Sequence, residues 1–370
     1  MPLLANNHAC TALAGQALNY FFMKKIIFIL LFATAGFTAC KKEFAETKTA
    51  TETSLTNAIN APVTCTGNTW GDQQLYKGSI SNKPLTYNNK AYVFDFIKDK
   101  VFIYNGTSWD SISMFIPFNK NPDFVFTIGN KGYLGHIPEW GPDPRDVAWF
   151  WQYDFVAKTW SSKATYPGLS NHPPSTFTIG NKGYAVGGAY YSFSSSLIYH
   201  SIKETWEYNQ ATNSWTQKAD LPFIGIYAAT GFSIGNKGYI VNGAFWTGVS
   251  NPTIYLSDLY EYNPATNAWS FKTPFPGAKR IHTNVFVIGQ AAYAGGGLNS
   301  NNIEKSDYYK YSPATNAWVS VANFPNPHTL FNNCFSINSL GYVPYSKTGS
   351  TQLQMLKYTP KTCTLQGTSQ

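Results

Sequence analysis

Charged side chains are scarce in this chain of 370 residues. They make up 12% of it, whereas about 25% is usual for a soluble domain. Few stretches therefore have the pattern of a long amphipathic helix. The 27 basic residues outnumber the 19 acidic ones and give a formal charge of +8, but they are scattered. Because no basic stripe follows from this distribution, we expect no nucleic-acid partner.

Motifs of the common catalytic classes are also missing. The sequence has no nucleophile elbow, phosphate-binding loop or zinc signature, and it therefore indicates no cofactor. The apolar run at 26–32 is too short to cross about 30 Å of hydrocarbon as a helix. We therefore do not expect this run to hold the protein in a membrane as a spanning helix.

The N-terminal region has the parts of a secretory signal. Met23-Lys24-Lys25 precedes the apolar run, and small residues lead to Cys40. A cut before a cysteine resembles a bacterial lipoprotein signal, although Phe37 stands where such signals usually have Leu. We interpret residues 23–39 as the signal peptide, Cys40 as the lipidated residue and residues 1–22 as a mis-called upstream start.

Residues 40–62 are rich in Thr, Ala, Lys and Glu and lack an apolar period. They are typical of a flexible tether, or alternatively of a marginal helix. The resemblance implies a protein of the cell envelope, periplasmic or surface-facing, that touches the membrane through its lipid anchor only.

The remainder, 63–370, is dominated by a repeat with a period near fifty residues. One block reads Tyr-Asn-Pro-Ala-Thr-Asn-Ala-Trp at 262–269, and further copies lie at 208–215 and 311–318, with worn ones at 153–160 and 104–109. Upstream in each repeat, Gly-Asn-Lys-Gly or a variant separates two apolar runs, as at 180–183. This is a hairpin signal.

Each repeat therefore predicts four strands, in the third copy at about 175–179, 184–188, 204–208 and 214–218. Six such units predict an all-β, six-bladed β-propeller. The sixth copy lacks its tryptophan, and Trp70 near the N-terminus has no strand before it. We expect a strand near Trp70 to complete the last blade and close the ring. Cys65 and Cys363 would then lie together and form a disulfide, unless both stay free.

Gly-Gly after the second strand, followed by Tyr and Trp around a turn, resembles the kelch repeat. Sialic-acid mutarotases are exported six-bladed members of this group, so a sugar-active enzyme with Arg280 near an acid is one alternative. Galactose-oxidase-like proteins need a cysteine–tyrosine pair at copper. The body cysteines are Cys65, Cys334 and Cys363, near the chain ends or on an inner strand, which argues against copper chemistry.

Propeller loops joining strands two and three, and those leading to the next blade, open on one face. Candidate ligand-binding residues on these loops are Trp140, His172, Tyr190, Tyr191, Tyr227, Trp246, Arg280, His282 and His328. Aromatic plates beside polar groups suit sugars or peptides. The three histidines lack metal-ligand spacing, and we expect no metal.

From these features we predict a lipid-anchored, monomeric binding module that recognises a glycan or an envelope protein. A purely structural envelope protein is a third interpretation. The fold alone does not choose among them.

Overall fold

The computed structural model describes residues 63–78, 83–118, 120–138, 147–193, 197–223, 225–246, 253–326, 333–347 and 349–365. The expected upstream segment, signal peptide and tether, including Cys40, lie outside these residues. The chain divides into two compact units. One contains Cys65 and Cys363, which form a disulfide between the paired strands β1 (Val63–Thr66) and β32 (Thr362–Leu365).

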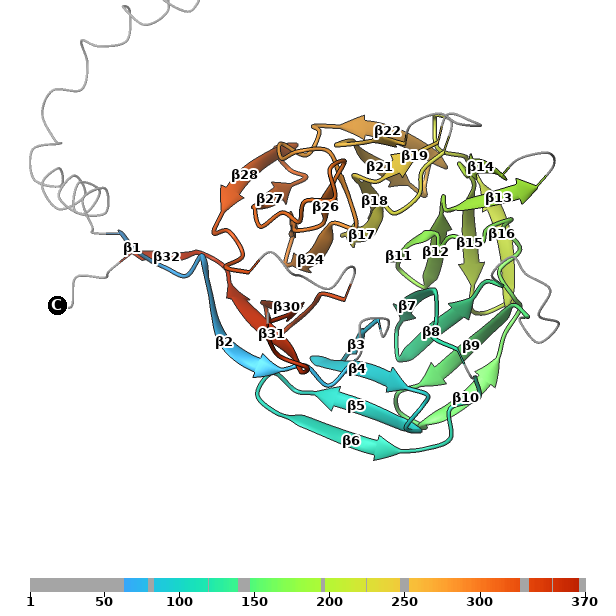
Figure 1. Ribbon diagram of the computed structural model, residues 1–370, viewed down its shortest axis with the longest axis horizontal. Coiled ribbons are helices and arrows are strands. Elements are labelled where there is room, and N and C mark those ends of the chain that lie inside the picture. The colour runs from blue at the N-terminus through green and yellow to red at the C-terminus, as the bar shows by residue number, and fades with distance from the viewer. Residues whose placement is uncertain are drawn as a thin grey trace, which may run out of the picture. The chain divides into compact units, whose positions relative to one another are not determined.

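The other unit, Thr66–Thr362, is a ring of six antiparallel four-stranded sheets (Figure 1). The six-bladed β-propeller expected from the sequence is confirmed. No helix in the described part of the chain is long and apolar enough to cross a membrane. The first three blades comprise β3 (Leu85–Tyr87), β4 (Lys90–Asp95), β5 (Lys100–Tyr104) and β6 (Trp109–Ser113); β7 (Phe124–Ile128), β8 (Lys131–His136), β9 (Trp149–Asp154) and β10 (Thr159–Ser162); and β11 (Ser175–Ile179), β12 (Lys182–Val186), β15 (Thr205–Asn209) and β16 (Ser214–Lys218).

The last three blades comprise β17 (Thr230–Ile234), β18 (Lys237–Val241), β21 (Leu259–Asn263) and β22 (Ala268–Lys272); β24 (Asn284–Ile288), β25 (Ala291–Gly295), β27 (Tyr308–Ser312) and β28 (Ala317–Val321); and β29 (Phe335–Ile337), β30 (Leu340–Ser346), β31 (Leu353–Thr359) and β2 (Thr69–Leu75). The second strand of the third blade begins two residues earlier than expected. Ile179 pairs with Lys182, so the turn has two residues instead of four.

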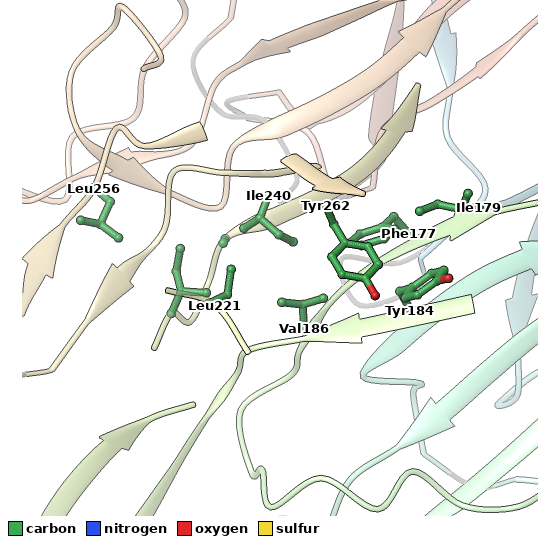
Figure 2. Packing of buried hydrophobic residues seen from close by; sticks show 10 residues of the cluster. Phe177, Ile179, Tyr184, Val186, Leu221, Ile240, Leu256 and Tyr262 are labelled. Carbon is green, nitrogen blue, oxygen red and sulfur yellow. The ribbon is translucent and has the colours of Figure 1, made fainter. Parts of the chain in front are cut away.

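The first strand of each blade faces the ring axis, and neighbouring first strands contact one another. Their exposure alternates with period two, as in β7, β11 and β17. The buried positions carry large apolar side chains that pack between blades. Figure 2 shows such a cluster, in which Phe177 and Tyr184 of one blade pack near Tyr262 of the next.

The recurring Tyr-to-Trp block is an inter-blade clasp. In the copy at 208–215, the Asn213 side-chain oxygen accepts hydrogen bonds from the Tyr208 hydroxyl (2.9 Å) and from the N–H of Ala164 in the preceding blade (3.0 Å). Trp215 Nε1 donates to the Ala164 carbonyl at 2.8 Å. The same set recurs at Tyr262, Asn267 and Trp269 on Ala219, and at Tyr311, Asn316 and Trp318 on Thr273.

The sixth copy of this clasp is divided between the two ends of the chain. The Asn68 side-chain oxygen accepts from the Tyr358 hydroxyl at 3.0 Å and from the Ala322 N–H at 2.8 Å. Trp70 Nε1 donates to the Ala322 carbonyl at 2.9 Å, and Trp70 pairs with Tyr358 across β2 and β31. The predicted closure by a strand near Trp70 is therefore confirmed.

The second glycine of Gly-Asn-Lys-Gly serves inter-blade packing, a role that differs from the turn role expected from the sequence. A Cβ at Gly238 would lie 2.1 Å from the Phe177 ring, and one at Gly183 would lie 2.2 Å from Phe126. The aromatic residue of one first strand thus rests on the backbone of the next blade.

We expect Lys158→Asn to stabilise the protein by about 0.5–1 kcal/mol, measured as the free energy of unfolding in urea. Lys158 has a φ of 58° where the equivalent residue Asn213 has 49°, and asparagine tolerates this left-handed region better than lysine. Lys203→Asn, on another exposed site, is the control and should give no gain. An equal or lower stability for Lys158→Asn would contradict this account of the worn repeat.

Candidate functional site

The loop-rich face of blades three to five carries small extra sheets. Paired strands β13 (Ala189–Phe193) and β14 (Leu197–Ser201) extend the third blade, and β19 (Ala244–Phe245) and β20 (Ile254–Tyr255) extend the fourth. In the fifth, β23 (Arg280–Ile281) pairs with β26 (Leu298–Asn299). Single β-bridges join the segments that lead into the third and fourth blades to these small sheets. They pair His172 with Ala189 and Tyr227 with Ala244.

Glycines let these loops approach the next blade closely. Gly188 N–H donates to the Ile226 carbonyl (2.8 Å), and Gly243 N–H donates to the Arg280 carbonyl (2.9 Å). Both glycines have a φ of 99°. In the fifth blade the equivalent pair with positive φ is Gly296 and Gly297. The hydrogen-bonded loops provide a fixed support for side chains on this face.

The hairpin β13–β14 has aromatic side chains on both of its faces, because successive residues of a strand point to opposite sides. Tyr191 lies opposite Tyr199, and Tyr190 lies opposite His200. Cross-strand partners share a face, and successive residues point to opposite faces. Tyr190 stacks on His200 with ring centroids 4.5 Å apart, and His200 Nε2 lies 3.0 Å from Ser192 Oγ. Tyr190 therefore lies on the face of the hairpin away from Tyr191.

Five rings from blades three and four form one aromatic cluster, defined as His172, Tyr191, Tyr199, Tyr227 and Trp246. Trp246 stacks on Tyr227, with centroids 3.8 Å apart and planes 13° apart. It also lies 4.6 Å from Tyr199 and 5.6 Å from His172. Tyr191 lies 6.2 Å from Tyr199 and 6.3 Å from His172. All five are half-buried, so they support one another and keep surface for a ligand.

Hydrogen bonds fix the two stacked rings of the aromatic cluster. The Trp246 N–H donates to Ser201 Oγ at 3.0 Å. The Tyr227 hydroxyl bonds to the Thr253 side chain, and burial raises the pKa of Tyr227 above its ordinary value, with a smaller effect of Tyr255. Tyr227 is therefore a neutral hydroxyl at physiological pH, able to donate or accept.

The structure places Arg280 in the interior, away from any ligand surface. Its side chain is 0% exposed. Its two terminal nitrogens donate to both Asp307 carboxylate oxygens at 2.8 Å, and further bonds reach the carbonyls of Gly296 and Ala278. The expected ligand-binding role of Arg280 is thus not met, because the guanidinium is engaged in holding β23 against neighbouring loops.

His282 lies close enough to Lys83 of the axial cavity to be affected by its charge, and its backbone N–H donates to the Ala228 carbonyl at 2.9 Å. Burial, with a contribution from the Lys83 charge, lowers the pKa of His282 to about 4, so the ring is neutral at physiological pH. Within the described residues no three His, Cys, Asp or Glu side chains are grouped to hold a metal ion. Trp140 and His328 lie outside the residues that the structure describes.

An axial cavity of about 220 Å³ lies where the six first strands meet. Equivalent positions from all six blades line it: Pro84, Val125, Thr176, Gly231, Val285 and Cys334. Cys334 donates its S–H to the Val285 carbonyl at 3.0 Å, and burial raises the pKa of this thiol to about 12. Cys334 is therefore an unreactive packing residue. Lys83 also lines the cavity.

Sequence reasoning missed Tyr199, His200 and Lys83. Tyr199 and His200 lie on β14, the second strand of a β-hairpin that was not predicted from the sequence. The run of aromatic residues at Tyr190 and Tyr191 could have indicated this hairpin. Lys83 precedes an irregular first blade, and nothing in its neighbourhood marks it as axial.

Comparisons with known proteins add little to this geometry. No family model matches the chain, and no curated protein matches it. A solved structure titled "Structure of YjhT" is similar to it, with 17% sequence identity and a TM-score of 0.46, over 58% of this chain and 69% of that chain.

Proposed function

We propose that this propeller is a glycan-binding module whose ligand stacks on the aromatic cluster. The observation that carries the proposal is the convergence of His172, Tyr191, Tyr199, Tyr227 and Trp246 from separate loops of two blades. The cluster lies outside the six four-stranded sheets. Packing between the blades therefore does not account for five aromatic rings on this loop-rich face.

The chemistry of the aromatic cluster favours a sugar. Aromatic faces pack against the apolar C–H faces of sugar rings, and nearby polar groups bond to the hydroxyl edges. The Tyr227 hydroxyl and the His172 imidazole supply such groups within the cluster. None of the five residues of the cluster is Asp, Glu, Lys or Arg, which favours a neutral glycan over an ionic one. A protein ligand with exposed aromatic or proline residues is the competing outcome of the test.

We further propose that the module is a kelch-type propeller held at the cell envelope by a lipid on Cys40. The supporting observations are the signal-like residues 23–39 and the cysteine that follows them. Metabolic labelling with an alkyne fatty acid should label the wild-type chain and leave Cys40→Ser unlabelled. Equal labelling of both would contradict the anchor.

The sugar-active enzyme remains without support from the site. It required Arg280 beside an acid and a bound sugar. Arg280 does lie beside Asp307, but the pair is internal and its guanidinium is 0% exposed.

A Trp246→Ala variant is expected to weaken glycan binding by about fivefold or more, because a stacked ring contributes on the order of 1–3 kcal/mol at a hot spot. A glycan array on the full-length protein would select the ligand, and calorimetry would compare the variants. Phe271→Ala is the matched control, since Phe271 is 55% exposed on an outer strand. Unchanged affinity in Trp246→Ala, or equal losses in both variants, would overturn the proposal.

A further inference from the structure

The axial cavity contains one cationic side chain. Lys83 Nζ donates to the backbone carbonyl of Asp123, and Lys83 makes no ion pair within the described residues. The Asp123 carboxylate is held elsewhere: Oδ2 accepts from the Ile137 N–H at 2.7 Å and lies 2.7 Å from His136 Nδ1. Of the three N–H donors of the ammonium, one is used within the described residues.

Lys83 is half-buried at the cavity wall and has no carboxylate in contact within the described residues. Burial lowers the pKa of its amine, and the nearby Asp123 charge only partly opposes this shift. The neighbouring His282 is neutral at physiological pH and gives no negative charge. A partly desolvated ammonium gains from an anionic partner, and charges that are taken out of water in proteins are usually paired. An anion in the cavity would supply the missing partner.

The hydroxyl side chains of Ser175 and Thr176 also line the cavity. Ser175 Oγ donates to the Ala229 carbonyl at 2.9 Å, and Thr176 Oγ1 donates to the Val125 carbonyl at 2.8 Å. A hydroxyl has one proton to donate, so each of these oxygens keeps lone pairs for a donor on a ligand. A bare anion would repel these oxygens, whereas ligand hydroxyls would satisfy them.

We infer that the axial cavity is a binding site for a short hydroxy-carboxylate, with its carboxylate on Lys83 and its hydroxyls on the Ser175 and Thr176 oxygens. The cavity of about 220 Å³ has room for a ligand of six or seven non-hydrogen atoms, at roughly 30 Å³ for each water displaced. This site is independent of the aromatic cluster and of the glycan proposed there.

Calorimetry of the full-length protein with sodium glycerate and sodium propionate at one ionic strength tests this inference. Glycerate should bind at least about tenfold more tightly than propionate, because only glycerate carries hydroxyl donors. Lys83→Met should weaken glycerate binding by about tenfold or more. Lys77→Met, at an exposed lysine, should bind as the wild type does.

A second variant separates ligand recognition from folding. Thr176→Val removes one acceptor, keeps Lys83, and should reduce the preference for glycerate over propionate. Equal binding of the two ligands by the wild type, unchanged glycerate binding by Lys83→Met, or no binding of glycerate at tens of millimolar would each overturn the site. Trp246→Ala should leave glycerate binding unchanged.

Discussion

A Trp70→Ala variant is expected to unfold with a free energy lower than wild type by about 3–5 kcal/mol, the usual cost of truncating a packed aromatic side chain. Trp70 lies within 6.2 Å of the rings of Phe286, Tyr308, Phe324 and Tyr358. Its indole N–H also bonds to the Ala322 carbonyl. The substitution removes these contacts at the junction where the two ends of the chain close the ring.

Urea unfolding followed by circular dichroism measures this loss. Trp206→Ala is the matched control, because Trp206 lies half-buried on β15 and its indole bonds only to Glu204 in its own blade. We expect a loss for Trp206→Ala of about 1 kcal/mol or less, as for other surface positions. Equal losses in the two variants would mean that ring closure at Trp70 adds nothing to ordinary packing.

An Arg280→Ala variant is expected to lose about 3–5 kcal/mol of stability, because it breaks a buried ion pair by removing one partner. The Asp307 carboxylate, only 24% exposed, would lose both of its guanidinium bonds. The carbonyls of Gly296 and Ala278 would lose donors as well. The Phe275 ring, 4.8 Å from the guanidinium carbon, would lose its cation.

The neighbouring residue provides the control for this second variant. Lys279 is exposed, and Lys279→Ala should change the stability by less than about 0.5 kcal/mol. Thermal unfolding of both variants gives the comparison, and glycan binding at a temperature where both are folded should match wild type. If Arg280→Ala kept its stability and lost ligand binding, Arg280 would be a binding residue after all.

The repeat made the fold predictable because its spacing encodes the contacts. Asn213, Asn267 and Asn316 occupy the same position in three copies of the block, and each accepts the same two hydrogen bonds. The broken sixth copy identified the closure because Asn68 and Trp70 are the missing half of that block. A pattern that recurs at a fixed interval thus carried information about contacts far apart in the chain.

The candidate site was less predictable, since its loops do not repeat. The sequence indicated Trp246, Tyr227, Tyr191 and His172 as loop residues, and the structure brings these four together. In the structure Tyr190 lies on the other face of the hairpin, because successive side chains of a strand point to opposite faces. Arg280 looked available because no local pattern revealed that Asp307, on a different loop, holds it.

The central claim is that ligand recognition lies on the aromatic cluster and not on the repeated clasps. A crystal structure of the full-length protein with the glycan selected by an array tests this claim most directly. We expect a sugar ring packed within about 4–4.5 Å of the Trp246 indole, with a hydroxyl bonded to Tyr227. A glycan bound on the outer strands or along the opposite face, with the aromatic cluster bare, would contradict it.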